Sequence, residues 1–253
     1  KKIKPYLWDS KKNHPMKKIF LSLSFVCSMA LVFAEEGMLI PSLLSAFESD
    51  MQAKGMKLTA EQIYSVNNSS IKDAIIHFGG GCTAELVSKS GLLLTNHHCG
   101  YSQIQSHSSL EKDYLKNGFW AKNGSEELGN PGLTASRMVR IEDVTKSVLF
   151  GIKESDDAAT RSLGMRKNMK KLIEDAKTGN HYVAEIKAFN YGNDFYLIVK
   201  EVFKDVRLVG TPPNSIGKFG GDTDNWVWPR HTGDFSVFRI YAGKDNKPAE
   251  YST

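Results

Sequence analysis

Alternating apolar and polar positions mark a hairpin in the first half of the chain. Cys82, Ala84 and Leu86 alternate with polar residues, and a second apolar run covers residues 92–94. Residues 88–91 between them read Ser-Lys-Ser-Gly, which is the polar, glycine-containing composition of a hairpin turn. The pattern predicts two short strands joined by a tight turn, and the second strand ends at a pair of histidines.

Further strands are expected in the second half of the chain. Residues 182–189 and 195–209 are rich in β-branched and aromatic side chains, and the sequence Asn-Tyr-Gly-Asn-Asp between them is typical of a hairpin turn. Another strand is expected at residues 235–241. Capping patterns, apolar periodicity and terminating glycines predict helices over residues 41–55, from Thr59 onward, before Gly118 and over residues 156–177. The sequence therefore predicts a mainly β fold, a barrel or a sandwich, with added helices.

The N-terminal region has the features of an export signal. A Met-Lys-Lys start at residue 16 is followed by the largely apolar residues 19–33 and by Ala34, a small residue suited to a cleavage site. The apolar run is shorter than the ~20 residues of a transmembrane helix. We therefore expect an exported protein, in the periplasm, with a cell-surface or extracellular location as the alternative. The expected divisions are residues 1–15, translated upstream of the true start, residues 16–34, the signal peptide, and residues 35–253, the exported part.

Charge and cysteine content narrow the class of protein. Residues 1–34 carry seven lysines and one aspartate, so the chain from Glu35 onward has a net charge of −1 although the whole sequence carries +5. No block of basic residues interleaved with aromatics follows, which argues against a nucleic-acid partner. Cys27 would leave with the signal peptide. The two remaining cysteines, in an oxidising compartment, favour a Cys82–Cys99 disulfide, with two unpaired thiols as the alternative.

A histidine pair and a later aspartate are the candidate catalytic groups. Histidine is well suited to take a proton from a serine hydroxyl at neutral pH, provided that a carboxylate fixes its tautomer and orientation. Asp234 is the best candidate for that carboxylate, because it directly precedes an alternating strand and so lies at a strand end. Asp222 and Asp224 are alternatives. The hairpin and the aspartate together predict half of a serine peptidase site.

These segments resemble chymotrypsin-like peptidases, whose histidine follows a hairpin in a Thr-Ala-Ala-His-Cys or Thr-Asn-x-His segment next to a disulfide. The aspartate of those enzymes opens an apolar strand. Thr-Asn-His-His-Cys at residues 95–99 and the strand after Asp234 match both features. The resemblance implies that His98 is the general base and acid, that Asp234 orients it, and that His97 is a neighbour.

Longer motifs are similar to the bacterial dipeptidyl-peptidase 7 and 11 family of serine exopeptidases. The motifs are Gly-Gly-Gly-Cys-Thr-Ala-Glu-Leu-Val from residue 79, Thr-Asn-His-His-Cys-Gly-Tyr from residue 95, and Asp-Asn-Trp-Val-Trp-Pro-Arg-His-Thr-Gly-Asp from residue 224. The resemblance spans residues 35–253. It implies part of a chymotrypsin-like double β-barrel peptidase domain, truncated before the serine, the oxyanion hole and the pocket for the side chain at the cleaved bond. It also implies that Asn225 and Trp226 bind the amino terminus of the substrate.

The implied activity is release of dipeptides from the free amino terminus of oligopeptides, by acyl transfer through a His/Asp/Ser triad. Neither a metal nor an organic cofactor is implied. We expect the 253-residue chain alone to be inactive, because it lacks the nucleophile. A homodimer is one option for the full-length protein, and the residue preferred at the cleaved bond is left open.

Three other functions stay open at this point. Zinc binding would use His97, His98, Cys82 and Cys99, but adjacent ligands rarely share a metal and a disulfide would consume both thiols. A trypsin-like endopeptidase would cleave peptides with a blocked amino terminus, whereas an exopeptidase would not. A non-catalytic peptide-binding protein built on a peptidase barrel would have no serine motif downstream.

Overall fold

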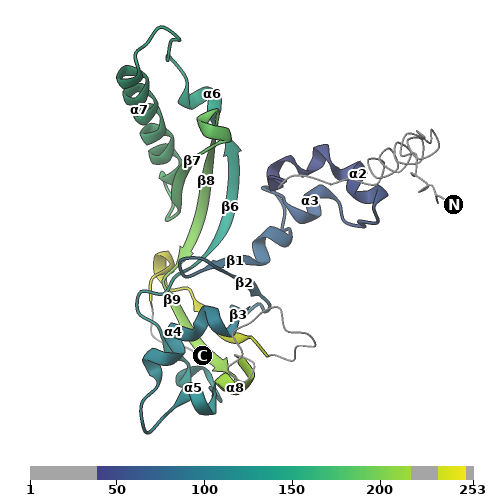
Figure 1. The fold of residues 1–253 in the computed structure, drawn as a ribbon, viewed down its shortest axis with the longest axis vertical. Coiled ribbons are helices and arrows are strands. Elements are labelled where there is room, and N and C mark those ends of the chain that lie inside the picture. The colour runs from purple at the N-terminus through teal and green to yellow at the C-terminus, as the bar shows by residue number, and fades with distance from the viewer. Residues whose placement is uncertain (1–38, 218–232, 249–253) are drawn as a thin grey trace, which may run out of the picture. The chain divides into compact units, whose positions relative to one another are not determined.

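A computed structural model describes residues 39–217 and 233–248, and antiparallel strands dominate this part of the chain (Figure 1). The strands form one sheet in the order β4-β9-β10-β3-β2-β1-β6-β8-β7, with β5 paired to β9 off this path. Their bounds are β1 Ile75–Phe78, β2 Cys82–Leu86, β3 Leu92–Thr95, β4 Phe119–Trp120, β5 Leu128–Gly129, β6 Ala135–Asp143, β7 Val183–Phe189, β8 Asp194–Phe203, β9 Asp205–Thr211 and β10 Ser236–Tyr241. The expected mainly β fold with added helices is confirmed.

Helices fill the connections between the strands. The α-helices are α2 Glu48–Ala53, α3 Ala60–Ile63, α4 His97–His107, α5 Tyr114–Asn117, α6 Thr145–Val148, α7 Ala158–Lys177 and α8 Asn214–Gly217. The 3₁₀ helices are η1 Pro41–Ala46, η2 Ile71–Ala74, η3 Gly124–Glu126, η4 Asn190–Gly192 and η6 Lys244–Asn246. In the described part of the chain, every helix is too short or too polar to cross a bilayer.

The β2–β3 hairpin forms where the sequence predicts it. Ser88 Oγ accepts the backbone N–H of Leu92 at 3.0 Å, which closes the turn. Gly91 has a φ of +77°, and a Cβ at this position would lie 2.6 Å from the backbone oxygen of Ile240 in β10. Glycine is therefore required here both for the backbone conformation and for the close approach of β10.

One hydrophobic core lies beneath the strands that carry the candidate site. It contains buried side chains from β1, β3, β9, β10 and α4, among them Phe78, Leu93, Ile104, Leu208 and Phe238. The rings of Phe78 and Phe238 lie 4.8 Å apart between centroids. This packing holds α4, which begins with the two histidines, against β10, which begins two residues after Asp234.

A second core lies under the long helix α7. Asp157 caps this helix by accepting the N–H of Thr160 at 2.7 Å. The apolar side of α7 packs with α6 against β7 and β8 around Val148 and Val199, and Figure 1 shows α7 running along these strands. None of the residues in this second core belongs to the catalytic candidates.

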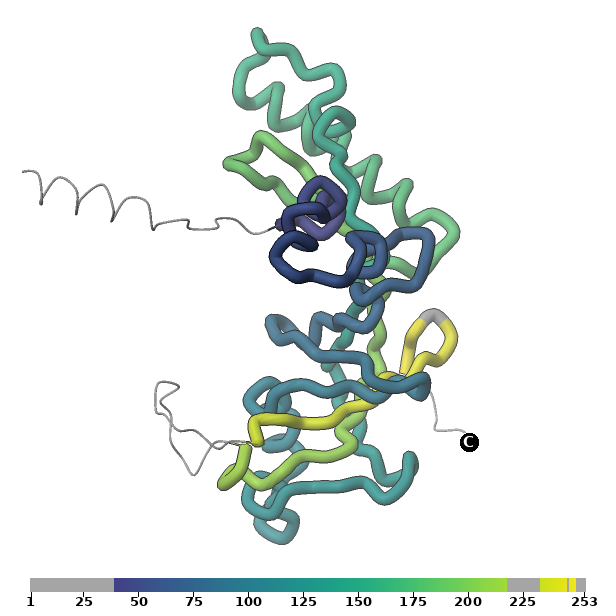
Figure 2. Tube along the Cα trace, turned by 90° about the vertical axis from the view of Figure 1, so that its right-hand side faces the viewer, coloured from purple at the N-terminus to yellow at the C-terminus, as the bar shows by residue number. Residues whose placement is uncertain are grey.

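One prediction of a strand was wrong in its length. Residues 195–209 were expected to form a single strand, but the structure has β8 ending at Phe203 and β9 starting at Asp205. The N–H of Lys204 donates to the backbone oxygen of Asn246 at 3.0 Å, and β8 pairs with β6 and β7 whereas β9 pairs with β10. In Figure 2 the yellow β10 runs between the blue β3 and the light-green β9. The break falls at Lys204 and Asp205, and no glycine, proline or asparagine marks it, which is why the sequence gave no turn signal there.

Candidate active site

β3 and α4 deliver two adjacent histidines to the end of the sheet. β3 ends at Thr95, Asn96 takes the N-cap position of α4, and His97 and His98 are the first two residues of that helix. Successive helical residues point about 100° apart, so the two rings leave the helix in different directions. His97 is fully buried, whereas 64% of the His98 side chain is exposed. Of the two, His98 is the one that a substrate can reach.

Asp234 meets His98 because β10 pairs with β3. The antiparallel register sets Ser236 opposite Thr95, so the residues just before β10 lie beside the residues just after β3. The buried Ser236 hydroxyl donates to the backbone oxygen of Asn96 at 2.9 Å. Two positions 136 residues apart in the sequence are thereby brought into contact.

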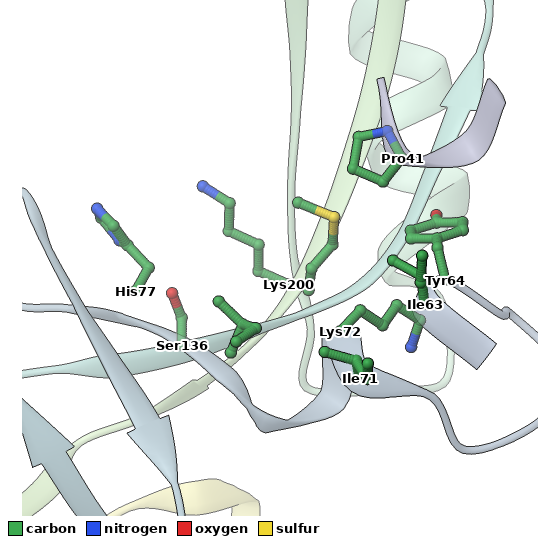
Figure 3. Close-up of a pocket in the computed structure, with 10 residues that line it drawn as sticks. Pro41, Ile63, Tyr64, Ile71, Lys72, His77, Ser136 and Lys200 are labelled. Atoms are coloured by element: carbon green, nitrogen blue, oxygen red, sulfur yellow. The ribbon is translucent and has the colours of Figure 1, made fainter. Parts of the chain in front are cut away.

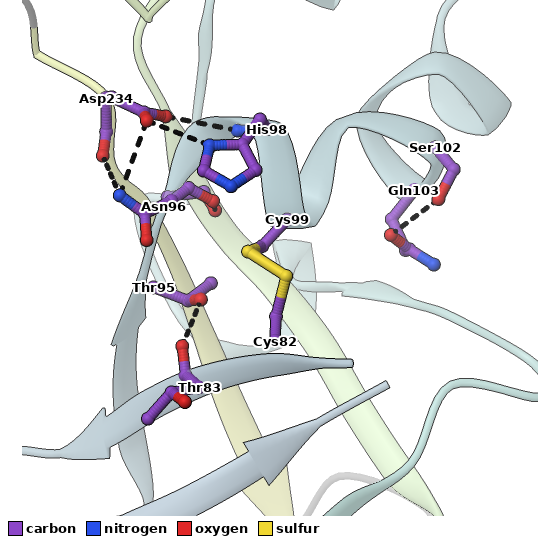
Figure 4. Close-up of a disulfide and its surroundings, with 10 residues drawn as sticks. Cys82, Thr83, Thr95, Asn96, His98, Cys99, Ser102, Gln103 and Asp234 are labelled. Atoms are coloured by element: carbon purple, nitrogen blue, oxygen red, sulfur yellow. Dashed lines mark hydrogen bonds and ion pairs between the residues drawn. A yellow bond between two sulfur atoms is a disulfide. The ribbon is translucent and has the colours of Figure 1, made fainter. Parts of the chain in front are cut away.

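The carboxylate of Asp234 is held by several donors (Figure 4). Its Oδ2 lies 2.9 Å from Nδ1 of His98, and its Oδ1 accepts the backbone N–H of His98 at 3.1 Å. That N–H is one of the donors at a helix start that has no partner within the helix. Asn96 Nδ2 donates to the backbone oxygen and to Oδ2 of Asp234, at 3.2 and 3.3 Å. These contacts fix the carboxylate, and the carboxylate in turn fixes the His98 ring.

The charge state of Asp234 decides the tautomer of His98. Burial raises the pKa of Asp234, but hydrogen bonds from the side chain and backbone of His98 and from the backbone of His97 together outweigh burial and hold that pKa below its usual range. Asp234 is therefore ionised at neutral pH. An ionised carboxylate only accepts hydrogen bonds, so in the neutral ring Nδ1 carries the hydrogen and Nε2 keeps a lone pair. This is the form in which a histidine can act as a base.

A disulfide ties β2 to the first turn of α4. Cys82 begins β2 and Cys99 directly follows His98, and their Cα atoms are 6.0 Å apart (Figure 4). In the chain-entropy model, closing a loop of this size contributes about 3 kcal/mol to stability. Among the described residues, Cys82, His98 and Cys99 also have the spacing of a metal site. Because both sulfurs are consumed by the disulfide, neither is a thiolate ligand, and this argues against the zinc hypothesis.

The other predicted site residues lie outside the part of the chain that the structure describes. These are Asn225 and Trp226, expected to bind the amino terminus of the substrate, and Asp222 and Asp224, the alternative carboxylates. Their roles stay predictions. Asn96 was missed by sequence reasoning, although asparagine directly before a helix is a common N-cap residue and could have drawn attention.

A separate apolar pocket of about 290 Å³ lies between the first helical segments and strands β1, β6 and β8 (Figure 3). Its lining residues are Pro41, Ile63, Tyr64, Ile71, Lys72, Ile75, His77, Ser136, Met138 and Lys200. Lys72 pairs with Asp73 and Lys200 pairs with Glu185, so both lining ammonium groups have carboxylate partners. Neither catalytic candidate lines this pocket, and it is not part of the site around His98.

Comparison with protein families identifies the chain. A family model described as peptidase S46 matches residues 34–253. The chain belongs to the peptidase S46 family. Among relatives, the Asp/Glu-specific dipeptidyl-peptidase of Capnocytophaga gingivalis is 56% identical over 238 residues, covering 94% of this chain and 33% of the relative. Dipeptidyl-peptidase 7 of the same organism is 47% identical over 241 residues, covering 94% of this chain and 34% of the relative.

Solved structures agree with this S46 assignment. The crystal structure of Porphyromonas endodontalis DPP11 in complex with the dipeptide Arg-Glu matches with a TM-score of 0.73 and 49% identity, covering 87% of this chain and 32% of that chain. The expected resemblance to the dipeptidyl-peptidase 7 and 11 family is confirmed. The S46 chain described here spans about a third of the length of the relatives that it matches.

Proposed function

We propose that this chain supplies the histidine and the aspartate of a serine dipeptidyl-peptidase. His98 is the general base and acid, and Asp234 orients it and stabilises its charged form. The observation that carries this proposal is the 2.9 Å contact between His98 Nδ1 and Asp234 Oδ2 beside an exposed ring. The family match and the names of the relatives support the reaction class.

The proposed reaction is acyl transfer through a serine ester. Nε2 of His98 takes the hydroxyl proton of the serine while the oxygen attacks the carbonyl carbon of the second substrate residue. The imidazolium, stabilised by Asp234, then gives that proton to the leaving amine. Nε2 of His98 then takes a proton from a water molecule that attacks the ester carbon, the bond to the serine oxygen breaks, and His98 returns the proton to that oxygen as the dipeptide leaves. The buried hydroxyl of Ser236 bonds to the backbone near the helix start, so Ser236 is not the nucleophile. Because the chain covers 33% to 34% of its dipeptidyl-peptidase relatives, we assign the nucleophile to a serine outside it.

We further propose a preference for Asp or Glu at the cleaved bond. Three relatives named Asp/Glu-specific dipeptidyl-peptidase match this chain at 51% to 56% identity and a fourth at 46%. Four relatives named dipeptidyl-peptidase 7 match at 44% to 47%. In the same proposal, Asn225 and Trp226 bind the free ammonium group of the substrate, through an amide oxygen and an indole face.

Export and assembly complete the proposal. A signal peptide at residues 16–34 directs the protein to the periplasm, and cleavage after Ala34 leaves Glu35 as the first residue. N-terminal sequencing of the protein from a periplasmic extract tests this. The complete protein is proposed to be a homodimer, which light scattering during size-exclusion chromatography tests.

The deciding experiment uses the complete protein encoded by the gene and matched peptides with a free or an acetylated amino terminus. We expect release of dipeptides ending in Asp or Glu from the free peptides and none from the acetylated ones. His98→Ala is expected to lower kcat/KM by at least about 10⁴-fold. His77→Ala is the matched control, because His77 is an exposed histidine that lines the separate apolar pocket.

Three outcomes would contradict the proposal. Equal cleavage of acetylated peptides would indicate an endopeptidase. Peptide binding without any hydrolysis would indicate a non-catalytic binding protein. Full activity of the His98→Ala variant would remove the histidine from the mechanism.

A further inference from the structure

His97, the neighbour of the proposed catalytic base, is held at both ring nitrogens. The side chain is fully buried. Its Nδ1 lies 2.9 Å from Thr211 Oγ1, and its Nε2 lies 2.7 Å from Asn214 Oδ1. Thr211 ends β9 and Asn214 begins α8, so the ring connects the start of α4 to a segment 114 to 117 residues later in the sequence.

The hydrogen-bond partners define the tautomer of this ring. The amide oxygen of Asn214 only accepts, so Nε2 of His97 carries the hydrogen. Nδ1 then accepts the hydroxyl hydrogen of Thr211 at 2.9 Å, a shorter contact than the 3.2 Å to the other acceptor of that hydroxyl, the backbone oxygen of Pro212. The neutral ring satisfies both nitrogens, and its tautomer is the opposite of the one that Asp234 imposes on His98. His97 is therefore built to hold a fixed position, with neither nitrogen left to exchange a proton with a substrate.

The segment held by His97 leads to the catalytic carboxylate. A Cβ at Gly217 would lie 2.5 to 2.7 Å from three atoms of the His97 ring, so the ring packs directly on the backbone of α8. The backbone oxygen of Ile216 accepts the N–H of Gly233 at 3.1 Å. Gly233 directly precedes Asp234, and the carboxylate of Asp234 accepts the backbone N–H of His98, the residue after His97, at 3.1 Å. The contacts thus form a path that begins at the His97 ring and returns to the next residue of α4.

We propose that His97 is a positioning residue for the catalytic pair: by holding α8, it fixes the backbone from which Asp234 reaches His98. This inference rests on the proposed function, because it assigns His97 a role in the same site. A buried histidine that served stability alone would affect unfolding and leave the geometry of the pair unchanged. The two roles differ in what a substitution at this position does to turnover.

The main test is His97→Leu in the complete protein. Leucine occupies much of the buried volume and forms none of the hydrogen bonds. We expect kcat for free peptides to fall by about 10-fold to 100-fold, because a misplacement of about 1 Å at a reacting group can cost ~100-fold in rate. KM should stay within about threefold, because His97 touches no substrate. His97→Gln, whose amide can donate to Asn214, is expected to recover part of the loss.

A control on the same helix separates positioning from stability. His107 is the last residue of α4, and its Nε2 bonds to Asn130 Oδ1 at 3.0 Å. His107→Leu makes the same chemical change to a hydrogen-bonded histidine away from Asp234. We expect it to lower the unfolding midpoint and to leave kcat within about twofold of the parent protein.

A spectroscopic measurement tests the inference independently of any activity assay. In protein labelled with ¹⁵N-histidine, the Nδ1–H of His98 bonded to Asp234 should give a downfield proton signal that His97→Leu weakens or abolishes and His107→Leu preserves. If the parent protein cleaves no peptide but shows this pattern, the proposed function fails and the positioning role stands. If it cleaves peptides and His97→Leu leaves both kcat and the signal unchanged, the positioning role fails alone.

A second variant covers the case in which His97→Leu does not fold. Asn214→Ala removes the partner of Nε2 and leaves the ring in place, and we expect roughly a tenfold loss of kcat. Where both variants fold, their effects on kcat should be less than additive, since they break the same connection. Full kcat and an unchanged His98 signal in Asn214→Ala, or fully additive losses, would overturn the inference.

Discussion

Replacing Asp234 by asparagine keeps the shape of the side chain and exchanges one acceptor oxygen for an amide donor. In the parent protein one carboxylate oxygen accepts the backbone N–H of His98, and the other accepts Nδ1–H of His98 and the amide of Asn96. The remaining oxygen of the variant can still accept the helix N–H. Its NH₂ group then faces Nδ1 of His98, which must accept, and the hydrogen moves to Nε2. In this tautomer His98 cannot take a proton from the serine.

The expected loss of activity is much larger than the expected loss of stability. In chymotrypsin-type triads the corresponding change lowers kcat about 10⁴-fold, which corresponds to ~5 kcal/mol of transition-state stabilisation. For folding, the variant loses a negative charge at the start of α4, a contribution of about 0.3 to 1 kcal/mol. It also sets its own NH₂ against the amide of Asn96, two donors without an acceptor, at a cost of about 1 kcal/mol. We therefore expect the free energy of unfolding to fall by about 1 to 2 kcal/mol.

Both quantities are measured on the same samples of the complete protein. Steady-state kinetics on free peptides gives kcat, and urea denaturation gives the free energy of unfolding. Asp143→Asn is the matched control, because Asp143 accepts the backbone N–H of Thr145 at 2.9 Å just before α6, away from the catalytic pair. This control should lose a comparable amount of stability and keep kcat within about twofold.

The reasoning on the tautomer would be refuted by either of two results. One is an Asp234→Asn variant that keeps more than about a tenth of the parent kcat. The other is a loss of kcat no larger than the loss of folded protein under assay conditions, with the Asp143→Asn control showing the same proportion. In both cases the aspartate would act through folding and not through the protonation state of His98.

Three further predictions concern stability. Replacing both Cys82 and Cys99 by serine should lower the free energy of unfolding by about 3 kcal/mol, and equal urea midpoints with and without the disulfide would show that it adds nothing. Gly91→Ala should lower the thermal unfolding midpoint clearly more than Gly132→Ala. Both glycines have a positive φ (+77° and +86°), but of the two only Gly91 would bring a Cβ against backbone, at 2.6 Å. Equal decreases in the midpoint would contradict the close contact. Because the pKa of Asp234 is lowered in the folded protein, its ionised form stabilises the fold above the unfolded pKa of about 3.9 and this contribution disappears as the pH falls through the lower folded pKa. The stability difference between the parent and Asp234→Asn should therefore shrink below about pH 4, and a difference that stays constant with pH would exclude this origin.

Elements defined by local chemistry could be predicted from the sequence. The β2–β3 hairpin depends on a short polar turn with Gly91 at the position that needs a positive φ. Helix α3 depends on reciprocal bonds between Thr59 and Gln62, at 2.9 and 3.2 Å, within four consecutive residues. Helix α7 starts one residue after Asp157 and ends just before Gly179, which has a φ of +74°. In each case the residues that define the element or its ends are close together in the sequence, so the sequence pattern was sufficient to predict it.

Helix α4 could not be predicted in this way, although it carries the histidines. Its buried positions are His97, Gly100 and Ile104, a helical spacing in which only one residue is a large apolar side chain. β10 packs so closely on Gly100 that a Cβ there would lie 2.8 Å from Ser236 Oγ and 2.9 Å from the ring of Phe238. A hydrophobic pattern does not register a glycine or a histidine as a core position. The buried face of α4 can be identified only from the structure, in which β10 packs against it.

The two adjacent histidines show why the site itself needed long-range information. His97 and His98 have the same side chain, are adjacent and follow the same strand, so the hydrophobic pattern does not distinguish them, and only the resemblance to peptidases whose histidine directly precedes a cysteine favoured His98. The distinction arises from partners 114 to 136 residues away, namely Thr211 for the buried ring and Asp234 for the exposed one. An ionised carboxylate beside an exposed ring leaves a nitrogen free to take a proton, whereas a hydroxyl and an amide around a buried ring occupy both nitrogens. Exchanging the two roles would require exchanging these partners. When one of the two histidines is substituted, the other should therefore not take over its role.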